Sequence, residues 1–240
     1  MKINYSLVDE ILEAIFPLPA QFGIDTDTEE LYWLDDMKEI VENIDSDSEF
    51  YFGMSKMVIV PSEEDFVIKI PFNGYYYAGW DDDTDEYENM WHDFSNAPGS
   101  KSSDYCFSEF EKYLALKRKG LGFFVAKTIF YKTISNINIY LQEKVIPFSD
   151  YVFSNPSHEI TKQSERIAQG MLMSEQLSTS RIHPTWLATC IDKYGLNKVN
   201  KFLNYCAAVD NDLLADLHRS NYGYRKNNLP ALLDFSNFCD

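Results

Sequence analysis

Apolar positions at the start of the chain recur three and four residues apart, which is the spacing of an amphipathic helix. Pro17 and Pro19 follow the first such stretch, so the helix is predicted to end before them. A second stretch begins at about Glu29, with Asp27 as the residue expected to cap it. We therefore predict two helices within residues 1–48, which form an acidic N-terminal extension.

The apolar pattern changes from helical spacing to that of β-strands after residue 49. Five short runs rich in β-branched and aromatic residues predict an antiparallel sheet, with one helix between its third and fourth strands. That helix is expected over residues 104–119, with Gly120 as its stop, and Ser135-Asn136 is expected to form the last hairpin turn. The predicted strands are residues 50–52, 57–60, 66–70, 125–131 and 137–145.

One acidic segment between the third strand and the helix has no usable hydrophobic period. It covers residues 81–93, with the sequence DDDTDEYENMWHD, and Pro98 and Gly99 follow it. Dense like charge and turn residues are typical of solvated loops. We therefore predict an exposed acidic insert over residues 81–103.

Beyond Pro147 the pattern becomes mostly helical and ends in a short hairpin. Pro184 suits the first turn of one of these helices, and Gly195 suits its C-terminal end. The order of elements predicts an α+β fold. The predicted helices are residues 158–177, 184–194 and 196–209, and the hairpin strands are residues 222–224 and 229–235, with a turn at 226–228.

The charge is distributed unevenly along the chain. Its 240 residues carry a formal net charge of −17, and residues 1–100 hold 24 acidic and 4 basic residues. Residues 101–240 hold 14 acidic and 17 basic residues. An acidic half repels phosphate backbones and anionic membranes, so no nucleic acid and no membrane is expected as a partner. The partner expected for this acidic half is a protein, either a substrate or an activating partner, with basic character.

Cysteine spacing and hydropathy bear on the cellular compartment. The four cysteines lie far apart without a C-x-x-C pair, which argues against a zinc site and a disulfide framework. No leader segment and no apolar run of membrane-spanning length is recognisable. The expected location is the cytoplasm of a bacterial cell or of a host cell.

Three polar residues near the end of the chain have the spacing of a magnesium–nucleotide site. Asn221 follows Asp216 by five residues, and Asp234 follows Asn221 by thirteen. Carboxylate and amide oxygens suit a hard cation, and a nearby carboxylate can accept the proton of a hydroxyl. Each residue alone is more often a turn or loop former. Lys69 adds a cation within an apolar strand, where we expect it to face a cleft or a carboxylate.

With these motifs, residues 50–240 resemble the protein-kinase-like superfamily. The resemblance implies a two-lobed fold, with a five-stranded antiparallel N-lobe sheet and a mostly helical C-lobe, and it implies ATP and Mg²⁺ as cofactors. It makes Lys69 the lysine that contacts the α- and β-phosphates. Its ion-pair partner would be Glu109 or Glu111, of which we favour Glu109.

The resemblance also assigns the residues of the reaction centre. Asp216 matches the catalytic aspartate, and Asn221 matches the metal-binding asparagine. Asp234 opens the triplet Asp-Phe-Ser, where the family has Asp-Phe-Gly, and would be the second metal ligand.

Two further segments are expected to contact the nucleotide. Glu143 and Val145 fall where the hinge between the lobes would present its backbone to adenine. The loop over the phosphates would be residues 52–56, with Gly53 as its one glycine. Fewer glycines permit fewer close backbone approaches, for which Ser55 and Lys56 are expected to compensate.

The domain plan is that of a minimal kinase of the bacterial or phage type. We expect an extension over residues 1–48, an N-lobe over 49–146 and a truncated C-lobe over 147–240. Because four residues follow Ser236, an activation loop and a full peptide-binding C-lobe are not expected.

The expected function is transfer of the ATP γ-phosphate to a protein hydroxyl, of Ser or Thr. One alternative is a kinase-shaped interaction protein with vestigial catalysis, which binds a basic partner through its acidic half. Another is a small-molecule phosphotransferase.

Overall fold

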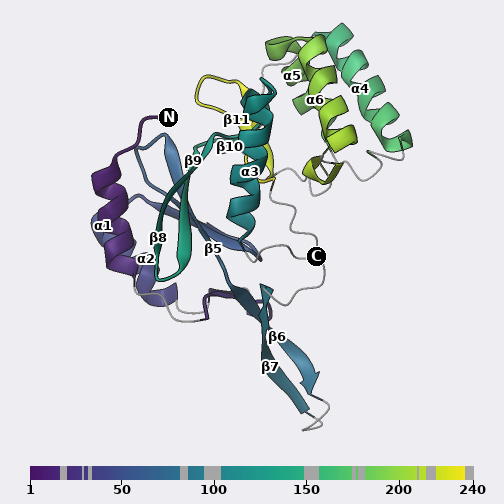
Figure 1. Ribbon diagram of the computed structural model, residues 1–240. Helices are drawn as coiled ribbons and strands as arrows, with labels where there is room; N and C mark the ends of the chain where they lie inside the picture. Colours follow the sequence, from purple (N-terminus) through teal and green to yellow (C-terminus); the bar gives the residue numbers. More distant parts are fainter. Residues whose placement is uncertain are drawn as a thin grey trace. The chain divides into compact units, whose positions relative to one another are not determined.

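A computed structural model describes most of the chain and divides it into two units. The described residues are 1–16, 21–28, 30–31, 34–81, 86–94, 104–148, 157–174, 177, 182–209, 211–214 and 220–235. The first unit comprises Met1–Phe107 and Thr128–Glu143, and the second comprises Ser108–Lys127 and Lys144–Asp240. The described part is an α+β structure with a five-stranded antiparallel sheet and two smaller sheets (Figure 1).

The central element of the first unit is the five-stranded sheet, in the order β3-β4-β5-β9-β8. All six residues of β5 are buried, as expected for a middle strand. Ser135 and Asn136 adopt positive φ angles of 49° and 66°, which form the predicted turn between the last two strands. The strands are β3 (Glu49–Phe52), β4 (Lys56–Val60), β5 (Phe66–Pro71), β8 (Thr128–Ile134) and β9 (Ile137–Glu143). The five predicted strands are confirmed, although β8 begins and ends three residues later than predicted.

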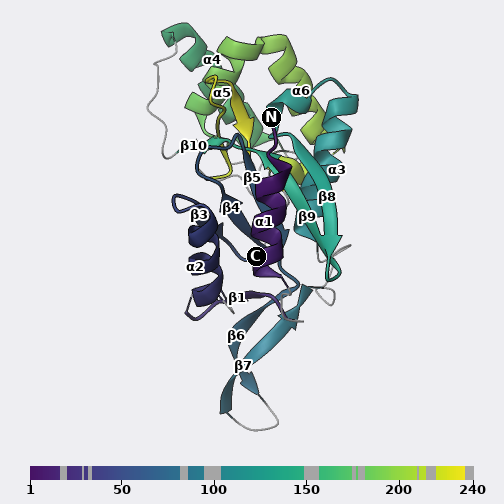
Figure 2. The same cartoon turned by 90° about the vertical axis from the view of Figure 1, so that its left-hand side faces the viewer.

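Helices α1 (Tyr5–Ile15) and α2 (Leu34–Ile44) lie against the sheet of the first unit (Figure 2). The predicted first helix is confirmed, and its side chains Val8, Ile11, Leu12 and Ile15 are buried. On α1, Asp9 accepts hydrogen bonds from Lys132 and from the hydroxyl of Tyr131 on β8. The bond from Lys132 is the main reason that the pKa of Asp9 is lowered. Burial, together with Asp9, raises the pKa of Tyr131 to about 12.

The second helix begins later than predicted, at Leu34 instead of Glu29. Asp25 explains the difference, because its carboxylate accepts hydrogen bonds from the amides of Asp27 and Thr28 and closes a turn. That turn joins the short strands β1 (Gly23–Asp25) and β2 (Glu30–Leu31). Asp27 therefore belongs to a β-turn and does not cap the helix.

The prediction of an acidic loop over residues 81–93 is wrong. Strands β6 (Gly74–Asp81) and β7 (Glu86–Asp93) pair along their whole length, and β1 joins β6 in parallel. Aromatic residues opposite each other stabilise such a pair, and the alternation of aromatic and acidic residues concealed the strand period. Tyr76 and Trp91 face each other with ring centroids 4.9 Å apart. Residues 82–85 and 95–103 of the predicted insert lie outside the described residues.

Helix α3 (Tyr105–Arg118) confirms the predicted helix and is capped by Asp104. One carboxylate oxygen of Asp104 accepts from the amide of Phe107 at 2.8 Å. The other oxygen accepts hydrogen bonds from two side chains of β9, the hydroxyl of Tyr140 at 2.8 Å and the side-chain amide of Asn138 at 2.9 Å. Burial raises the pKa of Tyr140 far above its ordinary value, and the negative charge of Asp104 makes the second-largest contribution. The start of the helix is thus attached to the sheet.

The second unit is mostly helical and has one apolar core. Gly195, with a φ of 86°, ends the helix over Pro184–Tyr194 as predicted. The helix predicted over residues 158–177 ends at Met173, four residues before its predicted end. Trp186 and Phe202 are fully buried in the core, and the ring of Phe202 stacks on Phe124 at 4.3 Å. The elements are α4 (His158–Met173), α5 (Pro184–Tyr194), α6 (Leu196–Val209), the 3-10 helices η2 (Gly122–Phe124) and η4 (Asn211–Leu214), and the sheet of β10 (Ile146–Pro147), β11 (Tyr222–Tyr224) and β12 (Pro230–Leu232).

No helix among the described residues is both long enough and apolar enough to span a membrane.

Replacing Asp104 tests how strongly α3 depends on its cap. We expect Asp104→Ala to lower the free energy of unfolding by about 2–4 kcal/mol, because it removes the cap and leaves the buried Tyr140 hydroxyl without this acceptor. Tyr140→Phe should cost only about 1 kcal/mol, since it removes the donor as well. Urea unfolding measures both, and equal stability of Asp104→Ala and the parent would contradict the assignment.

Candidate functional site

The hairpin of β11 and β12 brings together two of the predicted metal ligands. Asn221 precedes β11, and Asp234 follows β12. The carbonyl oxygen of Asn221 accepts hydrogen bonds from the amides of Leu233 at 2.9 Å and Asp234 at 3.3 Å. Asn221 is 4% exposed and Asp234 is half-buried. Residues thirteen apart in the chain therefore meet at the open end of one hairpin.

The turn of this hairpin follows from its polar residues, as predicted. Asn228 has a φ of 62°, in the left-handed region that asparagine tolerates better than most residues. Its amide donates to the carbonyl of Arg225 at 2.8 Å, and the amide of Arg225 donates to Leu229 at 2.9 Å. The side chain of Asn227 accepts from the amide of Leu229.

Arg225 fastens the hairpin to the rest of the second unit. Its guanidinium donates to the carbonyl oxygens of Phe123 at 3.1 Å, Val125 at 2.9 Å and Pro230 at 3.0 Å. The hydroxyl of Tyr194, at the end of α5, lies 2.6 Å from the same Pro230 oxygen. Hydrogen bonds from a charged donor are stronger than neutral ones, so this cluster fixes the hairpin against η2 and α5.

The other strand of the hairpin is fixed by a close backbone approach. A Cβ atom at Gly223 would overlap the carbonyl oxygen of Ile146 on β10, so only glycine fits there. The carbonyl of Gly223 accepts from the indole N–H of Trp186 at 3.2 Å. The ring of Tyr222 packs between Trp186 and Phe148, with centroids 5.4 and 5.3 Å away.

The segment after Asp234 is attached to α3. The ammonium group of Lys112 donates to the carbonyl oxygen of Phe235 at 3.1 Å. Glu109 lies one helical turn before Lys112 and is fully buried, whereas Glu111 is exposed. The two glutamates that the sequence offers as partners of Lys69 thus differ in burial, and a carboxylate is rarely buried without a polar or charged partner.

Lys69 lies at the centre of β5 and is 2% exposed. It stands opposite Val58 of β4 and Tyr140 of β9, so these three residues share one face of the sheet. The hydroxyl of Tyr140 on that face bonds Asp104, the cap of α3. The side chain of Lys69 is therefore buried instead of facing solvent.

The predicted phosphate loop is a tight turn between β3 and β4. The amide of Gly53 donates to the carbonyl of Lys56 at 3.2 Å, and the carbonyl of Ser55 accepts from Phe72 at 2.9 Å. Ser55 and Lys56 are both buried, and Lys56 is the first residue of β4 instead of a loop residue. Two residues before Val58, it lies on the same face of the sheet as Lys69. Two buried lysines therefore lie on one face of neighbouring strands.

The predicted hinge connects β9 to β10. Glu143 is the last residue of β9 and pairs with Phe66. Val145 is buried and packs with Ala126 and Ala231 in a small apolar cluster. Val145 thus belongs to the packing around β12 in the second unit.

Asp216 and Ser236 lie outside the described residues. Within the described ranges, no group of three or more His, Cys, Asp or Glu side chains could hold a metal ion. The amide oxygen of Asn221 and the carboxylate of Asp234 are nevertheless hard oxygen donors of the kind that Mg²⁺ takes, often with water completing its shell.

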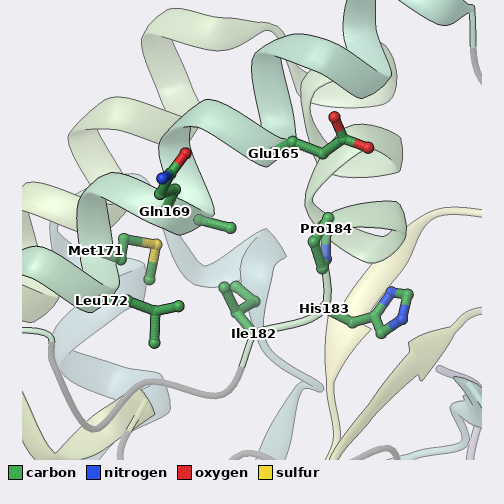
Figure 3. A pocket seen from close by; sticks show the side chains of 8 residues that line it. Glu165, Gln169, Met171, Leu172, Ile182, His183 and Pro184 are labelled. Carbon is green, nitrogen blue, oxygen red and sulfur yellow. The ribbon is translucent and has the colours of Figure 1, made fainter.

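A pocket of about 430 Å³ lies apart from these residues, between α4 and the start of α5 (Figure 3). Its lining is mostly apolar and includes Met171, Leu172 and Ile182. At its edge His183 caps α5 by accepting from the amide of Thr185. None of the predicted site residues lines this pocket, and no motif in the sequence indicated it.

Comparison of the chain with protein-family models, with curated proteins and with solved structures finds no match.

Gly223 offers a direct test of how the hairpin is positioned. Gly223→Ala should lower the free energy of unfolding by about 1–3 kcal/mol, because the new methyl group overlaps Ile146. Gly170→Ala is the matched control, since nothing lies near that position on α4 and the helix should gain about 0.5–1 kcal/mol. Urea denaturation of both variants decides the matter, and a tolerated alanine at position 223 would refute the close approach.

Proposed function

We propose that the chain is an ATP- and Mg²⁺-dependent kinase that transfers the γ-phosphate to a protein hydroxyl, of Ser or Thr. The observation that carries the proposal is the backbone pairing of Asn221 with Asp234, which unites an amide and a carboxylate at one end of a hairpin. The element order supports it, because five antiparallel strands are interrupted by one helix after the third, as the resemblance to kinases implies.

In this proposal the two described metal ligands have one role. Asn221 and Asp234 hold Mg²⁺ through their side-chain oxygens. Bound Mg²⁺ would neutralise phosphate charge as the phosphoryl group is transferred. Asp216 orients the acceptor hydroxyl and takes its proton.

The buried charges of β4, β5 and α3 have the other role. Lys69 contacts the α- and β-phosphates, and Glu109 holds the ammonium group of Lys69 in place. Lys56 lies on the same face of the sheet as Lys69 and adds a second cation for the phosphates. This second lysine offsets the scarcity of glycines in the turn at residues 52–56, where backbone amides would otherwise bind phosphate.

Nucleotide binding can be measured through stability. With Mg²⁺ and a non-hydrolysable ATP analogue at about 100 times its dissociation constant, the protein should gain about 2.7 kcal/mol, seen as a higher Tm. Asp234→Asn should lose the Mg²⁺-dependent part of this gain. Asp192→Asn removes an exposed carboxylate from α5 of the same unit and should keep it. A parent protein without any shift would contradict the proposal.

Transfer is tested with labelled ATP and Mg²⁺, using the purified full chain and a protein lysate. We expect label on Ser or Thr of protein, and at least a hundredfold less with Asp216→Asn, because the acceptor proton loses its base. Label found only on small molecules would identify a small-molecule phosphotransferase. Nucleotide binding without transfer would identify a kinase-shaped interaction protein.

A further inference from the structure

Strand β7 forms an open edge of the smaller sheet in the first unit. The sheet order is β2-β1-β6-β7, and among the described residues β7 pairs with β6 alone. The register of β1 on β6 covers Gly74–Tyr76, so residues 77–81 of β6 have β7 as their one strand neighbour within the part of the chain that the structure describes. Figure 1 shows the two strands as a long ribbon. Such an edge presents a row of backbone donors and acceptors to any strand that can approach it.

Side-chain packing fixes the register of this ribbon. A Cβ atom at Gly74 would overlap the indole of Trp91, and one at Gly79 would overlap the end of Met90. Two large side chains of β7, those of Met90 and Trp91, therefore sit over glycines of β6. Tyr76 packs against Trp91 on one face, and Tyr75 packs against His92 on the other at 4.9 Å. A ribbon held in one register offers a preorganised edge, which lowers the entropic cost of binding.

The pairing register divides acidic from aromatic positions. Residues directly opposite each other share a face, and successive pairs alternate between faces. In the outer part of the ribbon, register positions that contain acidic residues therefore alternate with register positions that are aromatic on both strands. The first set is Gly79–Glu88 and Asp81–Glu86, and the second is Tyr76–Trp91 and Trp80–Tyr87.

The charge of the ribbon selects among possible partners of the edge. Seven of the twenty residues from 74 to 93 are Asp or Glu, and none is Lys or Arg. A second copy would bring the same charge to the same edge, and like charges opposite each other destabilise a strand pair. Nucleic acid and anionic membranes are repelled for the same reason. A cationic protein segment is attracted.

We propose that the open edge of β7 binds an extended basic segment of a partner protein as an added strand. The side-chain alternation of β7 sets its pattern. In the bound segment, Lys or Arg occupies alternate positions, in register with Glu86 and Glu88. Apolar residues occupy the positions between them, in register with Tyr87 and Trp91. This surface is separate from the residues of the proposed kinase site, and binding needs no nucleotide.

The test uses the full chain without nucleotide and fluorescein-labelled octapeptides at low salt. The alternating peptide KVKVKVKV should bind, measured by anisotropy. KKKKVVVV, with the same composition, should bind at least tenfold more weakly, and EVEVEVEV should not bind. Equal binding of the two basic peptides would overturn the proposal, because it would show attraction by charge alone.

Two variant chains locate the site. Glu86→Gln/Glu88→Gln should weaken binding of the alternating peptide by about fivefold, because it removes two cross-strand pairs of opposite charge. Glu10→Gln/Glu13→Gln changes the net charge equally at exposed positions on α1 and should leave binding unchanged. An equal loss in both variants would overturn the assignment to β7.

Backbone methylation of the peptide tests strand pairing itself. Methyl groups on alternate amides that face β7 should abolish binding, whereas methyl groups on the other alternate set should leave it within about twofold of the unmodified peptide. Loss with both sets, or with neither, would contradict pairing along one edge. Light scattering should find the chain monomeric at low salt, and a dimer that Glu86→Gln/Glu88→Gln strengthens would instead assign the edge to a second copy.

Discussion

The three carbonyl oxygens around Arg225 are the constraint on which the second unit depends. They belong to Phe123, Val125 and Pro230, so one guanidinium joins the segment after α3 to the hairpin about a hundred residues later. The ends of short helices leave carbonyl groups without partners inside the helix, and here a charged donor satisfies them. These bonds fix the turn end of the hairpin. Backbone hydrogen bonds join Asn221 and Asp234 at its open end.

Burial of an ionisable group is the second constraint, and it concerns helix α3. Glu109 is fully buried, and moving a carboxylate from water to an apolar interior is costly unless other groups compensate it. At the start of the same helix, one carboxylate, that of Asp104, both caps the helix and accepts the hydrogen bond from the hydroxyl of Tyr140 on the sheet.

Local patterns predicted much of this architecture, and non-local contacts account for what they missed. The strand at residues 66–70, the turn at Ser135-Asn136 and the helix from Pro184 to Tyr194 were predicted because each depends on neighbouring residues. Likewise, the spacing of Asn221 and Asp234 indicated that they lie on one hairpin. The cluster around Arg225 could not be predicted, since two of its three carbonyl partners, Phe123 and Val125, lie about a hundred residues away in the sequence. Strand β7 was missed because its many acidic residues are typical of a loop and obscure the alternation of aromatic and polar residues. Strands β1 and β2 were missed because they are too short to show an alternating pattern.

The distribution of positive charge in the first unit is the observation that composition alone could not interpret. Residues 1–100 contain four basic residues among 24 acidic ones, and two of the four, Lys56 and Lys69, are buried on one face of neighbouring strands. Solubility does not require this, and burial of a cation works against folding unless anionic or polar groups compensate it. The opposite charge is concentrated in residues 1–48 and in the ribbon of β6 and β7. The two buried lysines of β4 and β5 and the acidic ribbon of β6 and β7 therefore separate opposite charges within the first unit.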